Sequence, residues 1–190
     1  MTFLGEIKAK ILGFVLSKMK REKKALGQLV DFDSAESVGI LFDYNNVLDR
    51  DFVVSFADKL ASSGKRVQVL GFCRSKKVSN FVEPESYFPK IVPQVCVESD
   101  FGWRKLFRSG ALKRFASTGF DILVDLTPKD FLLIKILVGL SNAKLKTGFY
   151  EYNFENRFDL MIREPGESSI SYRMDNLEKY LKIINSPKND

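Results

Sequence analysis

Residues 37–73 read SVGILFDYNNVLDRDFVVSFADKLASSGKRVQVLGFC, and this stretch indicates the class of fold. Its two apolar runs, residues 37–43 and 66–73, have the length and continuity of buried strands. Between them, apolar side chains recur at helical spacing: Phe52, Val53, Phe56 and Leu60. Asp49 is the expected cap of this helix and Gly64 its stop. A strand, a helix and a strand with short connections predict a right-handed crossover unit of a parallel sheet.

The alternation of strands and helices continues along the rest of the chain. Short apolar runs predict further strands at residues 95–97, 121–126, 144–149 and 158–162. Helical spacing predicts helices at residues 106–116 and 128–140, with Pro128 in the first turn of the second. The chain closes with an amphipathic helix whose shared face carries Leu177, Tyr180, Leu181 and Ile184. We therefore expect an α/β fold, a single Rossmann-like, doubly wound and mostly parallel sheet over residues 37–186.

Composition limits the classes of function open to the chain. With 190 residues and 45% hydrophobic content it can bury one sizeable core, and no run approaches the roughly 20 apolar residues of a membrane span. The lack of histidine removes the commonest general base and most zinc and non-haem iron sites. Cys73 and Cys96 lie inside apolar, strand-like runs, which favours buried reduced thiols over a disulfide.

The first 30 residues, here called the leader, carry almost all of the net charge. They hold seven bases and two acids, which is +5 of the total of +6, while the other 160 residues hold 23 bases and 22 acids. Apolar residues recur at helical spacing and predict a helix of about 20 residues: Leu4, Ile7, Ile11, Val15 and Met19. The predicted partner-binding bases of the leader are Lys10, Lys18, Lys20, Arg21 and Lys24. All but Lys18 cluster opposite the apolar stripe.

Three destinations are open to such a basic amphipathic leader: its own domain, an anionic membrane surface, or a groove on a protein or RNA partner. Lys8 and Lys10 interrupt its apolar residues, and Lys18, Lys20 and Arg21 follow where a cleavage site would lie. We therefore expect no secretory signal and a cytoplasmic location, with peripheral membrane contact as the alternative.

Residues 101–115, FGWRKLFRSGALKRF, interleave aromatic and basic side chains. Single-stranded nucleic acid is bound by this combination, which makes Arg104, Lys105 and Arg108 further candidate partner-binding residues. Aromatic residues at helical spacing more commonly face the core, with the intervening bases in solvent, and we favour that interpretation.

The candidate catalytic residues follow the predicted strands, because ligands of doubly wound sheets gather at the carboxyl ends of the strands. Three aspartates lie there: Asp43, Asp125 and Asp130. The chain has neither a GxGxxG nor a GxxxxGK(S/T) motif, so we expect no nucleotide cofactor, and we assign no metal. In the interpretation that we favour, Asp43, Asn45 and Asn46 only form a polar turn into the next helix.

Residues 42–48, FDYNNVL, resemble the nucleophile motif of haloacid dehalogenase-type phosphatases. The resemblance implies Asp43 as the nucleophile, with Asp125 and Asp130 as magnesium ligands. Asn45 stands where that family has its acid, and an amide cannot donate and recover a proton as a carboxyl group does.

Residues 120–150 resemble a strand, helix, strand unit in the acceptor lobe of heptosyltransferase-type glycosyltransferases. The matching positions are Asp125, Leu126, Ala143, Lys146 and Gly148. The chain has no counterpart of that family's Gly-Asp pair after the first strand, or of its second lobe, which binds the nucleotide sugar. The resemblance therefore implies a shared scaffold without the reaction.

Most of the chain, including FDLMI at residues 158–162, resembles a family of small uncharacterised proteins from Bacteroidota. That resemblance implies a cytoplasmic bacterial setting and no particular activity. We expect a non-catalytic binding or adaptor module that docks through its leader onto a protein, a ribosome or RNA. The alternatives are a degenerate phosphatase- or glycosyltransferase-like enzyme that uses the strand-end carboxylates, and a peripheral membrane or RNA-associated protein.

Overall fold

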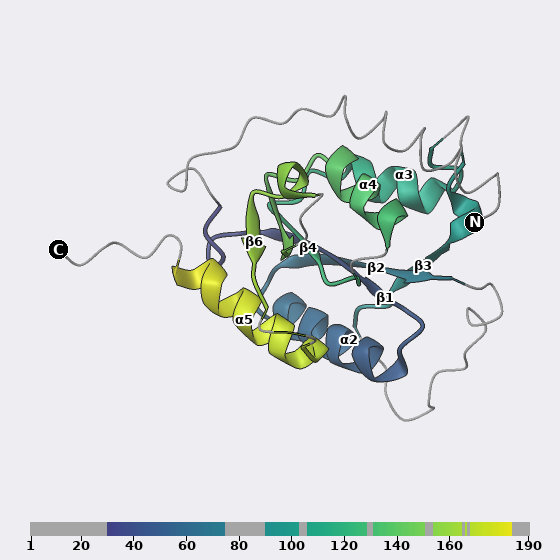
Figure 1. Cartoon of the computed structure of the whole chain (residues 1–190). Coiled ribbons are helices and arrows are strands. Elements are labelled where there is room, and N and C mark those ends of the chain that lie inside the picture. The colour runs from purple at the N-terminus through teal and green to yellow at the C-terminus, as the bar shows by residue number, and fades with distance from the viewer. Residues whose placement is uncertain are drawn as a thin grey trace.

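The computed structural model describes residues 30–74, 90–102, 106–128, 131–150, 154–164, 166 and 168–183 (Figure 1). The predicted helix of the leader therefore lies outside the described residues, as does Ile184 of the predicted C-terminal face.

Six strands form one sheet in the order β3-β2-β1-β4-β5-β6, and every neighbouring pair is parallel. The strands are β1 (Ser37–Asp43), β2 (Arg66–Cys73), β3 (Gln94–Val97), β4 (Ile122–Asp125), β5 (Leu145–Phe149) and β6 (Leu160–Ile162). The helices are α2 (Val47–Ser62), α3 (Gly110–Ser117), α4 (Leu132–Leu140) and α5 (Ile170–Ile183), with short 3-10 turns η3 (Glu98–Asp100) and η4 (Glu155–Arg157). This arrangement confirms the predicted Rossmann-like, doubly wound fold.

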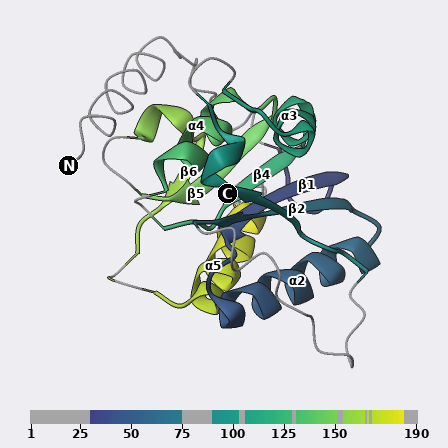
Figure 2. The same cartoon turned by 90° about the vertical axis from the view of Figure 1, so that its right-hand side faces the viewer.

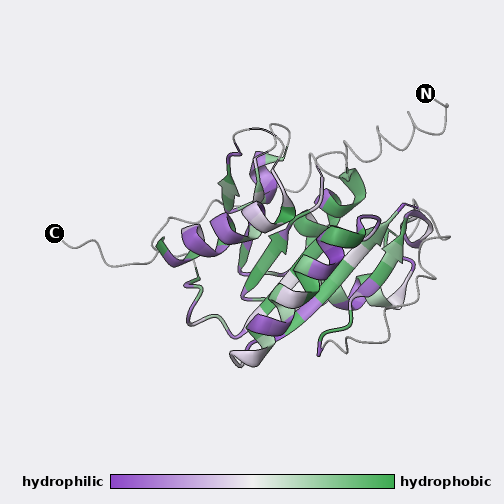
Figure 3. Ribbon diagram, turned by 90° about the horizontal axis from the view of Figure 1, so that it is seen from below, coloured by the Kyte–Doolittle hydropathy of each residue, from purple (hydrophilic) through white to green (hydrophobic). Residues whose placement is uncertain are grey.

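The helices cover both faces of the sheet, and each face has its own core (Figures 1 and 2). Helices α2 and α5 lie side by side on one face, and α3 and α4 lie on the other. Successive side chains of a strand point to opposite faces, so Ile40 and Phe42 of β1 enter the α2 and α5 core while Leu41 enters the other. The outward surfaces of α2 and α5 carry hydrophilic stretches, drawn in purple (Figure 3).

Helix α2 begins three residues earlier than its predicted cap implies. Asn46 is the residue that caps it: its Oδ1 accepts hydrogen bonds from the backbone N–H groups of Leu48 (3.1 Å) and Asp49 (3.4 Å). Asp49 lies inside the first turn, where a negative charge is favourable next to the helix dipole. The stop at Gly64 is confirmed, because Gly64 follows the helix with φ +91°, a conformation that residues with a side chain rarely adopt.

Two other helices begin later than predicted. Residues 106–109 are not helical, because Phe107 pairs with Phe101 in an isolated antiparallel bridge and the Ser109 hydroxyl caps α3 by accepting from the Leu112 amide (3.2 Å). Helix α4 starts at Leu132 rather than at Pro128, with Phe131 at its cap position.

The C-terminal helix confirms Leu177 and Leu181 as core residues but not Tyr180, which is 45% exposed. The buried stripe of α5 is Ile170, Met174, Leu177 and Leu181. Tyr180 lies about 100° around the helix from Leu181 and so points away from the core.

Both cysteines are buried reduced thiols, as predicted. Cys73 belongs to the core on the α2 side and Cys96 to the core on the α3 side, so the thiols face opposite ways. Burial raises the pKa of Cys96 to about 12, with smaller contributions from Asp100 and Cys73. Within the described ranges, no helix has the length and apolar character to cross a membrane.

Candidate functional site at the carboxyl ends of the strands

The order in which strands are added to the sheet reverses between β1 and β4, since β2 and β3 extend it on one side and β4, β5 and β6 on the other. Helix α2 follows β1 onto one face, and α4 follows β4 onto the other, so the two connections diverge at this point. In doubly wound folds ligands bind in the crevice outside the carboxyl ends of such a pair of strands. The residues that flank it are 43–46 after β1 and 126–128 after β4.

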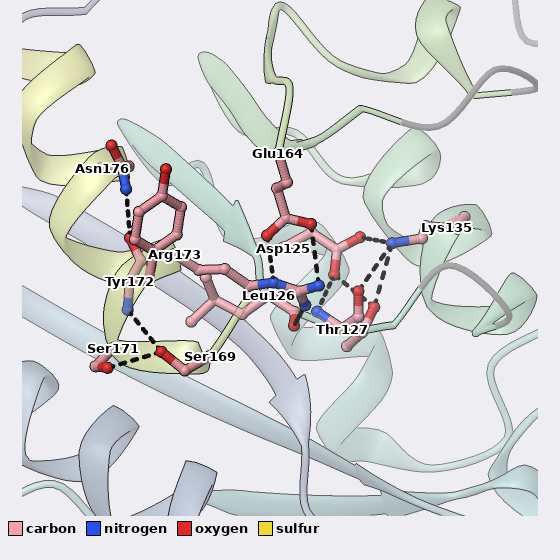
Figure 4. A network of polar contacts seen from close by, with 10 residues as sticks. All are labelled: Asp125, Leu126, Thr127, Lys135, Glu164, Ser169, Ser171, Tyr172, Arg173 and Asn176. Carbon is pink, nitrogen blue, oxygen red and sulfur yellow. Dashed lines mark hydrogen bonds and ion pairs between the residues drawn. The ribbon is translucent and has the colours of Figure 1, made fainter. Parts of the chain in front are cut away.

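Asp125, the last residue of β4, has both carboxylate oxygens bound by its own chain (Figure 4). One oxygen accepts from the amide (2.9 Å) and the hydroxyl (2.6 Å) of Thr127, and the other accepts from Lys135 Nζ at 2.7 Å. Both side chains of the Asp125 and Lys135 ion pair are buried, at 0% and 4% exposure. Lys135 also contacts the Thr127 hydroxyl (3.3 Å), and Phe158 lies beneath its ammonium group. The pair is therefore part of a buried internal network.

A second ion pair approaches the same segment from the opposite face of the sheet (Figure 4). Arg173 of α5 donates to both oxygens of Glu164, from Nε at 2.6 Å and from Nη2 at 3.1 Å. Its Nη1 reaches the carbonyl oxygen of Leu126 at 3.5 Å, and its guanidinium lies over the ring of Phe149. Arg173 is thus held in place by a fork-shaped pair, which leaves its side chain only 17% exposed.

Asp43, the last residue of β1, is half-buried and forms the predicted polar turn. Its Oδ1 accepts from the amide of Asn45 at 2.9 Å and from the Asn45 side chain. The side-chain oxygen Oδ1 of Asn45 in turn accepts from the Cys73 thiol at 3.3 Å, which ties the end of β1 to the end of β2. Asn46 caps α2, so the Asp43, Asn45 and Asn46 interpretation as a turn into the helix is confirmed.

Asp49 is a member of this site that the sequence interpretation missed. Its pKa is raised above the ordinary value of 3.8, first by partial burial and then by the negative charge of Asp43. The positive charge of Arg173 and the hydrogen bond with Asn46 act in the opposite direction. Asp49 therefore lies within electrostatic reach of both Asp43 and Arg173, and holds its proton to a higher pH than an isolated aspartate.

The donor set does not fit the magnesium site that the phosphatase resemblance implies. Asp125 is enclosed and bound on both oxygens, so it cannot also coordinate an ion beside Asp43. Across the part of the chain that the structure describes, no three His, Cys, Asp or Glu side chains are grouped to hold a metal.

The structure does not describe most of the other predicted site residues. Asp130 lies outside the described residues, and so do Lys10, Lys18, Lys20, Arg21, Lys24, Arg104 and Lys105. Arg108 is exposed just before α3, where its backbone N–H donates to the Asp100 carbonyl (2.7 Å). The aromatic residues near it face inward, since Phe101 and Phe115 are buried in the core beneath α3. The favoured interpretation of these two aromatics as core residues is confirmed.

Comparison with known proteins identifies a family. Residues 8–184 match DUF6913, which is described as a family of unknown function. The chain belongs to the DUF6913 family. The match spans the whole sheet and most of the leader of this DUF6913 protein. No curated protein matches its sequence, and no solved structure matches it.

Proposed function

We propose that this DUF6913 protein is a non-catalytic binding module of the cytoplasm that docks onto an acidic partner through its basic leader. The observation that carries the proposal is the state of Asp125. At the point of the sheet where a catalytic carboxylate would face a ligand, this one is fully buried and bound by Thr127 and Lys135. A carboxylate in that state supports the fold and has no oxygen left for a substrate.

The distribution of charge supports the second half of the proposal. The leader holds +5, while residues 31–190 hold 23 bases and 22 acids, which is +1. A concentrated positive segment on a nearly neutral body attracts polyanionic or acidic surfaces and makes the association dependent on salt. An acidic protein or ribosomal RNA has the complementary charge.

The proposal is tested with two variants of equal charge. In the first, the leader residues Lys20, Arg21 and Lys24 are changed to Gln. In the matched control, the exposed bases Arg66, Lys90 and Lys179 are changed to Gln on the described body. Each full-length chain is immobilised and exposed to cytoplasm of the native organism at low and high salt, with and without ribonuclease.

We expect the leader variant to retain about tenfold less partner than the wild type, and the control variant to retain nearly all of it. Partner retained by the wild type should fall as salt rises. Equal retention by both variants would show that the leader is not the docking element. Capture by anionic vesicles, lost on Ile11→Glu, would instead assign the leader to a membrane surface.

A second candidate function is supported by Asp49. A carboxyl group with a raised pKa beside the half-exposed Asp43 at the crevice is an arrangement that enzymes use for general acid and base catalysis. This is the degenerate phosphatase- or transferase-like alternative, with Asp49 as proton donor. Hydrolysis of p-nitrophenyl phosphate by the wild type that disappears in Asp43→Asn, at unchanged stability, would establish it. Equal rates for both chains would remove it.

A further inference from the structure

Helix α4 is apolar around its whole circumference. Its sequence is LLIKILVGL, and its one charged residue, Lys135, points to Asp125. Ile134, Leu137 and Val138 face the core beneath the helix. At 3.6 residues per turn, Ile136 points roughly opposite to those three side chains, away from the sheet. An outward position of this kind is normally in solvent.

Ile136 is nevertheless fully buried, with 0% of its surface exposed. It belongs to neither of the two core clusters of the described residues. Around it on the outer face, Leu132, Leu133 and Leu140 are only partly exposed. The helices described next to α4 are α3 and η4, and both flank it. The burial of Ile136 therefore calls for a cover on the outside of α4, formed by residues beyond the described ranges.

The leader has the complementary surface. Its stripe of Leu4, Ile7, Ile11, Val15 and Met19 repeats every three or four residues, which matches an apolar helix face in length and spacing. Of the other undescribed segments, residues 75–89 lead to Ile91, whose amide donates to Asp58 of α2, and residues 184–190 follow α5; both helices lie on the opposite face. The remaining segments are short: residues 103–105, 129–130, 151–153, 165 and 167. None of them carries a comparable row of aliphatic side chains.

The path of the chain permits this placement. Val30 packs against the α2 and α5 core near the start of β1, and α4 ends at Leu140, just before the start of β5. Both points lie at the amino edge of the sheet, because β1 and β5 are parallel. Residues 20–29 span up to about 33 Å when extended, which exceeds the roughly 20 Å across the sheet and one helix layer on either side.

We propose that the leader lies across the outer face of α4 in the same chain, with its apolar stripe over Leu132, Ile136 and Leu140. In this position Lys10, Lys20, Arg21 and Lys24 point to solvent, because they lie opposite the stripe. The exposed bases Arg108, Lys113 and Arg114, next to and on α3, lie on the same side of the sheet as α4 and extend this basic surface. The role of that surface in holding an acidic partner rests on the proposed function; the docking of the leader does not.

Photo-crosslinking in the full chain identifies the cover. Leu140→benzoylphenylalanine places the reactive group on the partly exposed outer face of α4, where it does not disturb Ile136. After irradiation and digestion, we expect crosslinks to residues 3–19 in monomeric protein. In the control, Phe52→benzoylphenylalanine on the exposed side of α2 should give none to the leader. Crosslinks from position 140 to another segment, or between two chains, would overturn the proposal.

Proteolysis provides a second measurement. The seven bases of the leader are trypsin sites, and a docked helix must detach before it is cut. We expect Ile11→Glu to speed cleavage between residues 8 and 24 at least tenfold, and Ile11→Leu to leave the rate nearly unchanged. Equal rates for Ile11→Glu and wild type would contradict docking. If crosslinks form but the three-charge leader variant keeps its partners, the docking stands and the proposed function fails. If no crosslinks form but the variant loses its partners, the proposed function stands and the docking fails.

Discussion

The two ends of strand β4 each present an aspartate, and the chain treats them in opposite ways. Asp121, at the amino end, accepts from the amides of Glu36 (3.0 Å) and Ser37 (3.0 Å) and from the Ser37 hydroxyl (2.9 Å), and pairs with the exposed Lys144. Asp125, at the carboxyl end, pairs with a lysine that is buried with it. The first contact joins strands in partial contact with water, and the second fills the place where this class of fold usually holds a ligand.

The two carboxylates also differ in the groups that stabilise their negative charge. The hydrogen bonds from Lys144, Ser37 and Glu36 outweigh burial and lower the pKa of Asp121 from 3.8 to about 2. Asp125 depends on Lys135 instead, because a buried charge without a partner is strongly unfavourable. We therefore expect the carboxyl end of β4 to be more sensitive to substitution than the amino end.

The largest effect is expected for Lys135→Met. This change removes the cationic partner of the buried Asp125 and should cost about 3–5 kcal/mol in the free energy of unfolding, measured by urea denaturation. Adding Asp125→Asn should recover most of the loss, since the charge then disappears together with its partner. Lys113→Met on the exposed side of α3 is the control and should change stability by less than about 0.5 kcal/mol. Similar losses at both lysines would refute a special role for the buried pair.

Gly148→Ala tests how closely the carboxyl end is packed. Gly148 is paired with Asp125 across the sheet, and a Cβ there would lie 2.7 Å from Phe158 and 3.3 Å from the Asp125 carbonyl oxygen. Overpacking of this kind should cost about 1–3 kcal/mol. Gly119→Ala, at the amino end, meets nothing within 4 Å and should be neutral in the same thermal or urea measurement. A neutral Gly148→Ala would mean that Phe158 moves aside freely.

Asp121 should make stability depend on acid. Because its folded pKa is lowered, its contribution of about 2 kcal/mol is complete above about pH 4 and is lost as the pH falls towards 2. Asp121→Asn should therefore cost about 1–2 kcal/mol at pH 7 and flatten the pH dependence of stability between pH 4 and pH 2. Denaturation midpoints across that range measure both effects. An unchanged slope in the variant would contradict the assignment.

The smallest effect is expected for Lys144→Gln. The Lys144 side chain is 64% exposed, so water and salt screen its 2.7 Å contact with Asp121. The melting temperature should fall by no more than about 2 °C at low salt, and the difference from wild type should vanish near 0.5 M salt. A loss that persists at high salt would show that this pair behaves like the buried one.

Most of the fold follows from the sequence because its strands are short, continuous apolar runs. The runs at residues 37–43 and 66–73 are β1 and β2 to the residue. The helix starts are harder, since Phe107 looks like a helical core residue but pairs with Phe101 across a turn. The order of strands was not predictable, because it depends on which strand edges pair through backbone hydrogen bonds in three dimensions.

The sequence predicted Asp43 and Asp125 at the carboxyl edge of the sheet, where the structure has them, but it did not predict their contacts. Asp43 and Asp125 were found because they end strands. Arg173 belongs to α5 and Glu164 follows β6, and the sequence does not fix where these two elements lie in the fold. Lys135 left a signal that is clear in hindsight. It is the only charged residue in an otherwise apolar nine-residue helix, and such a lysine has to find a carboxylate inside the protein.

The central place of β1 in the sheet also governs how the chain assembles during synthesis. One neighbour of β1 in the sheet is β2, which follows directly after α2. The other is β4, and Ser37 at the start of β1 contacts Asp121, just before β4 and 84 positions later. At translation rates of about 5–20 residues per second, one hydrogen-bonding side of β1 stays open for roughly 4–16 seconds after the strand is made. During that interval the nascent chain therefore exposes an unpaired edge of a strand with apolar side chains, which is the kind of surface that chaperones shield.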